Sequence, residues 1–256
     1  MSRFKLAANA GFKAVEISTP DMYDHTPQEI RAALDDNSLQ CALFNMPAGD
    51  WAGGDRGLAA VLGREKDFDA SLDVTVRYAE VLGSPLVHCL SGVLPPDTPA
   101  VLPDAERTYH RSLGKAVSVL EKMGIQVLIE PINQRSIPGY YLRSFEQAEE
   151  VIQEFKDLQS VVTHPMILFD VFHAQIIGGD LTNVLRRYKK HIGHIQIAGV
   201  PDRGEPDEHQ EVNFPYLFRF LADEIQWKGH VGCEYIPRGK TEEGLGWLTR
   251  SGLVSE

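Results

Sequence analysis

Short apolar runs alternate along the chain with longer segments in which apolar residues recur every three or four positions. The short runs indicate buried β-strands, and the periodic segments indicate amphipathic helices. The expected strands are Ala14–Ser18, Gln40–Met46, Leu86–Leu90, Gln126–Pro131, Met166–Val171, Ile192–Ala198 and His230–Tyr235. The expected helices are Thr26–Asp36, Arg64–Leu82, Asp104–Met123, Ser144–Phe155, Leu181–Tyr188 and Phe214–Glu224. This regular alternation predicts parallel strands joined by helical crossovers.

Seven strand–helix units of this kind favour an α/β fold of the (β/α) TIM-barrel type over an open doubly wound sheet. Gly83, Gly124 and Gly229 each stand between a helix pattern and a strand. We expect each of them to end its helix by adopting the left-handed backbone conformation. The glycine fingerprints of nucleotide-binding loops are missing from the sequence, so we expect no nucleotide cofactor. With no linker apparent, residues 1–256 are predicted to form a single domain.

An eighth strand, which a complete barrel of this type would contain, is absent from the pattern. Arg3–Ala10 has helical spacing, and we interpret it as the end of a helix that leads into the 14–18 strand. We therefore expect a barrel of seven recognisable strands that is incomplete at its N-terminus. A missing strand leaves an unpaired strand edge, which forms a seam in the barrel. Two copies of the chain can associate through such an edge, so a homo-oligomer stays an open alternative.

The composition is that of an ordinary globular protein, with 43% hydrophobic and 24% charged residues. The 25 basic and 36 acidic residues give a net charge of −11, which disfavours nucleic acids and acidic membrane surfaces as partners. Cys41, Cys89 and Cys233 lie in apolar runs, as is typical of a reducing compartment. No secretory signal or membrane-spanning run is found, so we predict a cytoplasmic protein.

Four of the expected strands carry a polar side chain near their carboxyl end. These residues are Glu130, Asp170, Gln196 and Glu234. Since neighbouring residues of a strand point to opposite faces, the four should face the barrel interior together with Leu128, Leu168, His194 and Gly232. The alternating residues Ile129, Phe169, Ile195 and Cys233 should face the helices. The carboxyl ends of barrel strands are where active sites are built, so these four form our candidate site.

Three carboxylates and one amide oxygen in one barrel mouth repel one another unless protons or a cation are bound. All-oxygen ligands favour Mg²⁺ or Mn²⁺ over zinc, so we predict a divalent metal site. The competing interpretation is that each residue separately forms an ion pair or caps a helix.

Three further residues of the same rim are candidates for binding the substrate. His173 follows Asp170 and is expected in a loop over the site. Arg203 follows the Gln196 strand and can hold a carboxylate in bidentate fashion, although a structural ion pair competes with this role. His88 ends the third strand and can line the pocket.

The strings around these residues resemble those of the hydroxypyruvate isomerase family, which belongs to the xylose-isomerase-like TIM-barrel superfamily. They are Ile129–Asn133, Phe169–Gln175, His194–Ala198 and Gly232–Gly239, with Phe44–Asp50 and Asn213–Phe218 in support. The resemblance extends from Ala8 to Leu248. At the position of Gln196, sugar epimerases of the superfamily carry His.

The resemblance implies an isomerase that interconverts hydroxypyruvate and tartronate semialdehyde, a reaction of carbohydrate metabolism on a small keto acid. It implies metal ligation by Glu130, Asp170, Gln196 and Glu234, with Glu130 and Glu234 as acid and base. His173 and Arg203 match positions that line the substrate pocket. The family opens with a strand and most of a helix ahead of Ala10–Glu16, and this chain is expected to begin inside that helix.

Three alternatives stay open. The substrate can instead be 2-oxo-tetronate or a related keto acid, or the enzyme can be a ketose epimerase. A truncated, non-catalytic barrel that binds a partner belongs to another class, favoured by the missing strand and opposed by the complete ligand set. An endonuclease-like barrel with several zinc ions needs more histidine ligands and a basic groove, which the net charge disfavours.

Overall fold

Seven parallel strands form one sheet in the computed structural model, which describes residues 1–18, 20–95, 102–157 and 163–251. The strands are β1 (Ala14–Ile17), β2 (Gln40–Asn45), β3 (Leu86–His88), β4 (Gln126–Ile129), β5 (Met166–Asp170), β6 (Ile192–Ile197) and β7 (Val231–Cys233). Their order in space is their order in the sequence, and every neighbouring pair is parallel. The predicted set of parallel strands is therefore confirmed.

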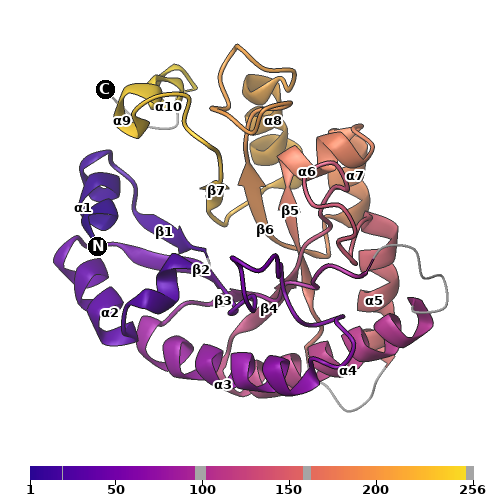
Figure 1. Cartoon of the computed structure of the whole chain (residues 1–256). Helices are drawn as coiled ribbons and strands as arrows, with labels where there is room; N and C mark the ends of the chain where they lie inside the picture. Colours follow the sequence, from indigo (N-terminus) through magenta and orange to yellow (C-terminus); the bar gives the residue numbers. More distant parts are fainter. Residues whose placement is uncertain (19, 96–101, 158–162, 252–256) are drawn as a thin grey trace.

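Helices surround this sheet on its outer side (Figure 1). The α-helices are α1 (Ser2–Asn9), α2 (Pro27–Asp36), α3 (Glu65–Leu82), α4 (Leu102–Leu120), α5 (Phe145–Asp157), α6 (Val171–Ile177), α7 (Leu181–Tyr188), α8 (Phe214–Phe220), α9 (Thr241–Gly244) and α10 (Gly246–Arg250). Short 3-10 segments η1 (Asp21–Asp24) and η3 (Glu121–Met123) and a π-helical turn η4 (Leu221–Ile225) complete the described elements. No helix in the described ranges combines the length and apolar character needed to cross a membrane.

Two of the three predicted helix-ending glycines are confirmed. Gly83 and Gly124 follow α3 and η3 with φ of 66° and 72°, a left-handed conformation that glycine adopts without a steric penalty. The prediction that Gly229 ends the helix before β7 was wrong. The helix before β7 ends earlier, where the π-helical turn η4 is followed by Gln226 in the left-handed conformation with φ of 57°.

The sheet curves into a nearly closed barrel whose two edges are β1 and β7 (Figure 1). Within the described part of the chain, no hydrogen-bonded ladder joins these two strands. Helix α1 and the α9–α10 segment flank this seam, and Leu6 and Leu248 line a shared cavity of about 390 Å³ between them. The barrel therefore has the seven strands that the sequence predicts.

The strands divide the core into an inner and an outer layer. Leu43, Leu128 and Leu168 pack against one another in a separate inner cluster. Ile129 and Phe169, one residue further along their strands, belong to the large cluster between sheet and helices. This alternation confirms the predicted facing of the strands. The three inner leucines therefore form a buried apolar layer inside the barrel. The next inward-facing residues, Glu130 after β4 and Asp170 on β5, lie one layer nearer the carboxyl ends of the strands.

Helix α2 begins with a capping box, which gives a first testable prediction. The Thr26 hydroxyl accepts the backbone N–H of Glu29, and the Glu29 carboxylate accepts the backbone N–H of Thr26. Thr26→Ala is expected to lower the free energy of unfolding by about 1 kcal/mol. Urea denaturation measures this loss. The exposed Thr241→Ala should leave stability unchanged, and an equal loss in both variants would contradict the cap assignment.

Candidate active site

The predicted site residues meet at the carboxyl ends of the central strands. Asp170 ends β5 and stands opposite Gln196 of β6, which in turn stands opposite Gly232 of β7. Glu130 and Glu234 come directly after β4 and β7. Each of the strands β4 to β7 thus supplies one polar side chain to the same end of the barrel.

Glu130 lies at the centre of this group and is 5% exposed. Its Oε2 lies 3.7 Å from His88 Nε2, and its Oε1 lies 3.8 Å from His173 Nε2. Among the described residues, no donor is within hydrogen-bond range of Oε1. Burial, reinforced by the nearby carboxylates of Asp170 and Glu234, raises the pKa of Glu130 well above its usual value.

Asp170 uses its two carboxylate oxygens for different purposes. Oδ1 accepts the backbone N–H of Phe172 at 2.8 Å, which caps α6. Oδ2 accepts a hydrogen bond from Arg203 Nη2 at 3.2 Å. The cap also corrects one expectation: His173 lies on the first turns of α6, and the predicted loop at this position is a helix.

Arg203 joins two of the predicted ligands. Its Nη2 donates to Glu234 Oε2 at 2.9 Å as well as to Asp170, and its guanidinium lies 5.1 Å from the ring centre of Phe172. Its backbone has φ of 57°, and its carbonyl accepts the N–H of Ile236 at 2.7 Å. Its Nε is buried, and no acceptor from the described chain contacts it. The guanidinium is therefore held in place, and its Nε–H is still to be satisfied.

Glu234 is the most open of the four predicted ligands, with 38% of its side chain exposed at the barrel mouth. The partial burial of its carboxyl group raises its pKa to about 7; Arg203 opposes this rise, and Asp170 adds to it. A carboxyl group with a pKa near 7 both takes up and releases a proton at neutral pH.

Gln196 is held by a residue that our sequence analysis did not single out. Gln196 Nε2 donates to Glu16 Oε2 at 2.7 Å, while the other Glu16 oxygen contacts His194 Nε2. This leaves Gln196 Oε1 buried, and it has no donor among the residues that the structure describes. A Cβ on Gly232 would collide with the Glu16 carboxylate, so glycine is needed for Glu16 to reach across the barrel.

Glu16 carries the same sequence signal as the predicted ligands, since it is an acidic residue inside an apolar strand. The signal that the other four shared therefore also identifies the residue that was missed. Asn133, which contacts His173, is a second site residue that was not among the predicted ones. It lies four positions after the end of β4.

His88 and His173, the two histidines nearest Glu130, both have pKa values below the usual range. Burial lowers the pKa of His88 to about 3, with His173 contributing in the same direction. Burial likewise lowers the pKa of His173 to about 4, against the opposing effect of Asp170. Neither ring therefore compensates the negative charge around it.

The donor set fits a divalent cation. Glu16, Glu130, Asp170 and Glu234 carry four carboxyl groups, and Arg203 returns one positive charge. Close carboxylates at low dielectric require protons or a cation, and the orphaned Oε1 atoms of Glu130 and Gln196 are free to accept one. One ligand atom each of Glu130, Asp170 and His173 also lie within 4.8 Å of one another. The carboxylate and amide oxygens of this set suit Mg²⁺ or Mn²⁺.

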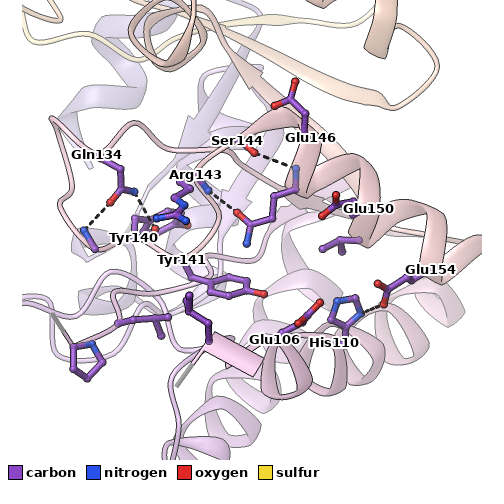
Figure 2. Close-up of a pocket in the computed structure, with 16 residues that line it drawn as sticks. Glu106, His110, Gln134, Tyr140, Tyr141, Arg143, Ser144, Glu146, Glu150 and Glu154 are labelled. Atoms are coloured by element: carbon purple, nitrogen blue, oxygen red, sulfur yellow. Dashed lines mark hydrogen bonds and ion pairs between the residues drawn. The ribbon is translucent and has the colours of Figure 1, made fainter. Parts of the chain in front are cut away.

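A cavity of about 800 Å³ lies outside the barrel, between α4 and α5 (Figure 2). Glu106, His110 and Glu154 gather at one end of it, and His110 Nδ1 lies 3.1 Å from Glu154 Oε2. The Glu154 side chain is 57% exposed, so water satisfies this carboxylate without an ion. None of the predicted site residues lines this cavity, and the barrel mouth stays the candidate active site.

Comparisons with known proteins match the chain to one family model and to relatives named as isomerases. The family model described as xylose isomerase-like TIM barrel matches residues 4–251. The chain is 44% identical over 248 residues to 2-oxo-tetronate isomerase of Cupriavidus necator, covering 97% of this chain and 91% of the relative. It is 39% identical to hydroxypyruvate isomerase of Escherichia coli strain K12, covering 97% and 92%.

Two solved structures have the same fold. A crystal structure titled AP endonuclease, family 2, from Brucella melitensis is 40% identical, with a TM-score of 0.88 over 97% of this chain and 92% of that chain. The 3-keto-D-glucoside 4-epimerase of Escherichia coli is 22% identical, with a TM-score of 0.77 over 97% and 93%.

Proposed function

The chain belongs to the xylose isomerase-like TIM-barrel family, and we propose that it interconverts hydroxypyruvate and tartronate semialdehyde. The protein is an isomerase of small keto acids, since relatives at 39–44% identity are named 2-oxo-tetronate isomerase and hydroxypyruvate isomerase. The proposed reaction is supported by two buried oxygens, Glu130 Oε1 and Gln196 Oε1, for which the described chain supplies no donor. They face an acidic barrel mouth that needs a cation.

Glu130, Asp170, Gln196 and Glu234 would hold this cation, and all four offer oxygen atoms. When bound, Mg²⁺ or Mn²⁺ would supply Lewis-acid polarisation of the substrate's carbonyl and hydroxyl oxygens and would offset the charge of an enediolate.

The two glutamates would move the protons. One takes a proton from C3 of hydroxypyruvate, the electron pair forms the C2=C3 bond, and the C2 carbonyl oxygen gains a proton. The other then delivers a proton to C2, the double-bond electrons form that C–H bond, and the C3 hydroxyl loses its proton to become the aldehyde. The raised pKa values of Glu130 and Glu234 support roles in which each group holds a proton in part of the cycle.

Arg203 would bind the substrate carboxylate. Its buried Nε–H has no acceptor among the described residues, and its Nη2 is already fixed by Asp170 and Glu234. A guanidinium held in this way can offer the free N–H to an anionic oxygen without a large loss of side-chain entropy. This arrangement favours a small acid over a neutral sugar.

A second candidate is isomerisation of 2-oxo-tetronate, since a relative of that name is 44% identical over almost the whole chain. The substrate has one carbon more, and the same acid–base steps apply. Ketose epimerisation is disfavoured by Arg203, and the Gln196 amide differs from the histidine expected of sugar epimerases. The metal identity, a homo-oligomer and the cytoplasmic location stay predictions.

The proposed function is tested with a panel of substrates. The purified chain, supplied with Mg²⁺ or Mn²⁺, is incubated with hydroxypyruvate, 2-oxo-tetronate and a neutral ketose, and product formation is followed by NMR. We expect the highest kcat/KM with hydroxypyruvate. A higher value with 2-oxo-tetronate would replace the first candidate by the second. Activity with the ketose alone, or with none of the three, would contradict both.

Glu16 gives a prediction about the cation itself. Glu16→Ala removes the acceptor that holds Gln196 Nε2, so the amide can rotate and present its N–H₂ group to the site. Loss of such a supporting contact is expected to weaken Mn²⁺ binding about 10–100-fold. Titration calorimetry with Mn²⁺ measures this change. Glu106→Gln, at the outer cavity, is the control, and wild-type affinity in Glu16→Ala would contradict the role of Glu16.

A further inference from the structure

Asn133 makes two contacts with one ring nitrogen of His173. Its side-chain Nδ2 lies 2.6 Å from His173 Nδ1, and its backbone N–H also points to Nδ1, with N and Nδ1 3.3 Å apart. Both residues are buried, with 2% and 1% of their surface exposed. Asn133 therefore hydrogen-bonds to His173 without competition from bulk water.

The orientation of the Asn133 amide is set by a third residue. The backbone N–H of Ser136 donates to Asn133 Oδ1 at 2.8 Å, so this atom is the amide oxygen. The atom next to His173 must then be the NH₂ group, which is a donor. A backbone N–H cannot be reversed at all. Two donors thus meet at His173 Nδ1, and this nitrogen must offer its lone pair.

A neutral imidazole that accepts at Nδ1 carries its proton on Nε2. His173 Nε2 lies 3.7 Å from Asp170 Oδ2 and 3.8 Å from Glu130 Oε1. Both distances are too long for a direct hydrogen bond but leave the N–H directed at the space beside the orphaned Glu130 oxygen. A nitrogen in this state has no lone pair to offer a metal ion.

We propose that Asn133 is a positioning residue that fixes His173 in the Nε2–H tautomer, so that His173 donates a hydrogen bond to a substrate oxygen beside Glu130. The substrate in this inference rests on the proposed function, whereas the tautomer does not. The three-residue group of Glu130, Asp170 and His173 accordingly divides into two oxygen ligands and one hydrogen-bond donor.

The tautomer is measured directly by long-range ¹H–¹⁵N NMR of the chain labelled at histidine, with the His173 signals assigned by their loss in His173→Gln. We expect the wild type to show a protonated Nε2 and an unprotonated Nδ1. Asn133→Asp replaces the donor by an acceptor of the same shape, so the proton should move to Nδ1. A wild-type spectrum with the proton on Nδ1 would overturn the proposal, whatever the enzyme's substrate is.

Activity separates positioning from simple packing. Asn133→Ala keeps the backbone donor and should lower kcat about tenfold, whereas the isosteric Asn133→Asp should lower it about 100-fold. A residue that only fills space would give the opposite order. Asn213→Asp is the matched control, because Asn213 already acts through its oxygen at the α8 cap and should keep both kcat and the His173 spectrum. An unchanged kcat in Asn133→Asp with a shifted tautomer would overturn the catalytic part of the proposal.

Discussion

Glu130→Gln is expected to lower the kcat of keto-acid isomerisation by about 10²–10⁴-fold, the usual contribution of a general acid or base. The amide keeps the shape of the carboxylate and its Oε1 position but cannot take up or release a proton at C3 or C2. Glu234→Gln should have an effect of the same size, since the mechanism uses one glutamate on each side of the intermediate. Steady-state rates with hydroxypyruvate at saturating Mg²⁺ measure both losses.

The fold should survive the substitution of Glu130. Its pKa in the folded chain lies above the usual value, so ionisation of this group opposes folding once the pH exceeds the value of the unfolded chain. A neutral amide removes that penalty, and the cation-free variant should be as stable as the wild type or more stable at pH 7. Glu154→Gln makes the same chemical change at an exposed site and should keep full activity. Turnover like the wild type in either Glu130→Gln or Glu234→Gln would contradict the assignment.

Arg203→Met is expected to raise the KM for hydroxypyruvate about 10–100-fold. A hydrogen bond to a charged group contributes roughly 1.5–3 kcal/mol, and each 1.4 kcal/mol corresponds to a factor of about ten. Methionine retains much of the apolar stem of Arg203 and removes the guanidinium that lies over the Phe172 ring, so the loss reports the guanidinium. The measurement is made at saturating Mg²⁺, because removing Arg203 also frees Asp170 and Glu234 to bind the cation more tightly.

A substrate analogue distinguishes carboxylate binding from a general disturbance of the site. Dihydroxyacetone has the hydroxypyruvate skeleton with a hydroxymethyl group in place of the carboxylate, so its binding should change much less in Arg203→Met. Arg187→Met, in which an exposed guanidinium paired with Glu149 is lost, should leave both ligands unaffected. Equal losses for hydroxypyruvate and dihydroxyacetone would show that Arg203 acts through Asp170 and Glu234 instead of through the substrate.

The strands and most helices could be predicted because buried apolar runs and helical periodicity are local properties of the sequence. Helix α6 could not, since its seven residues follow β5 without a break and show too few turns for a period to emerge. The end of the helix before β7 was wrongly predicted at Gly229, because the helix finishes in a π-helical turn after which Gln226 adopts the left-handed conformation. Short elements and unusual turns leave little trace in composition.

The candidate site was predictable where each residue interrupts an apolar strand, and unpredictable where its role depends on a partner across the barrel. Glu16 contacts His194 and Gln196, which follow it by 178 and 180 positions. Only the curvature of the sheet brings these groups together. The tautomer of His173 likewise depends on the Asn133 amide, whose direction the Ser136 N–H sets. The sequence names such residues, but the folded chain determines what they donate and accept.

Cation-dependent proton transfer by the two glutamates is tested by deuterium incorporation into the product when hydroxypyruvate is converted in D₂O, with Mg²⁺ and with a chelator. We expect close to one deuterium on C2 of each tartronate semialdehyde formed, because the second glutamate delivers a solvent-derived proton. We expect no turnover after chelation. Glu130→Gln controls for uncatalysed exchange. Product formed without deuterium on C2, or at an undiminished rate in the chelator, would contradict a cation-dependent site with two proton-transferring glutamates.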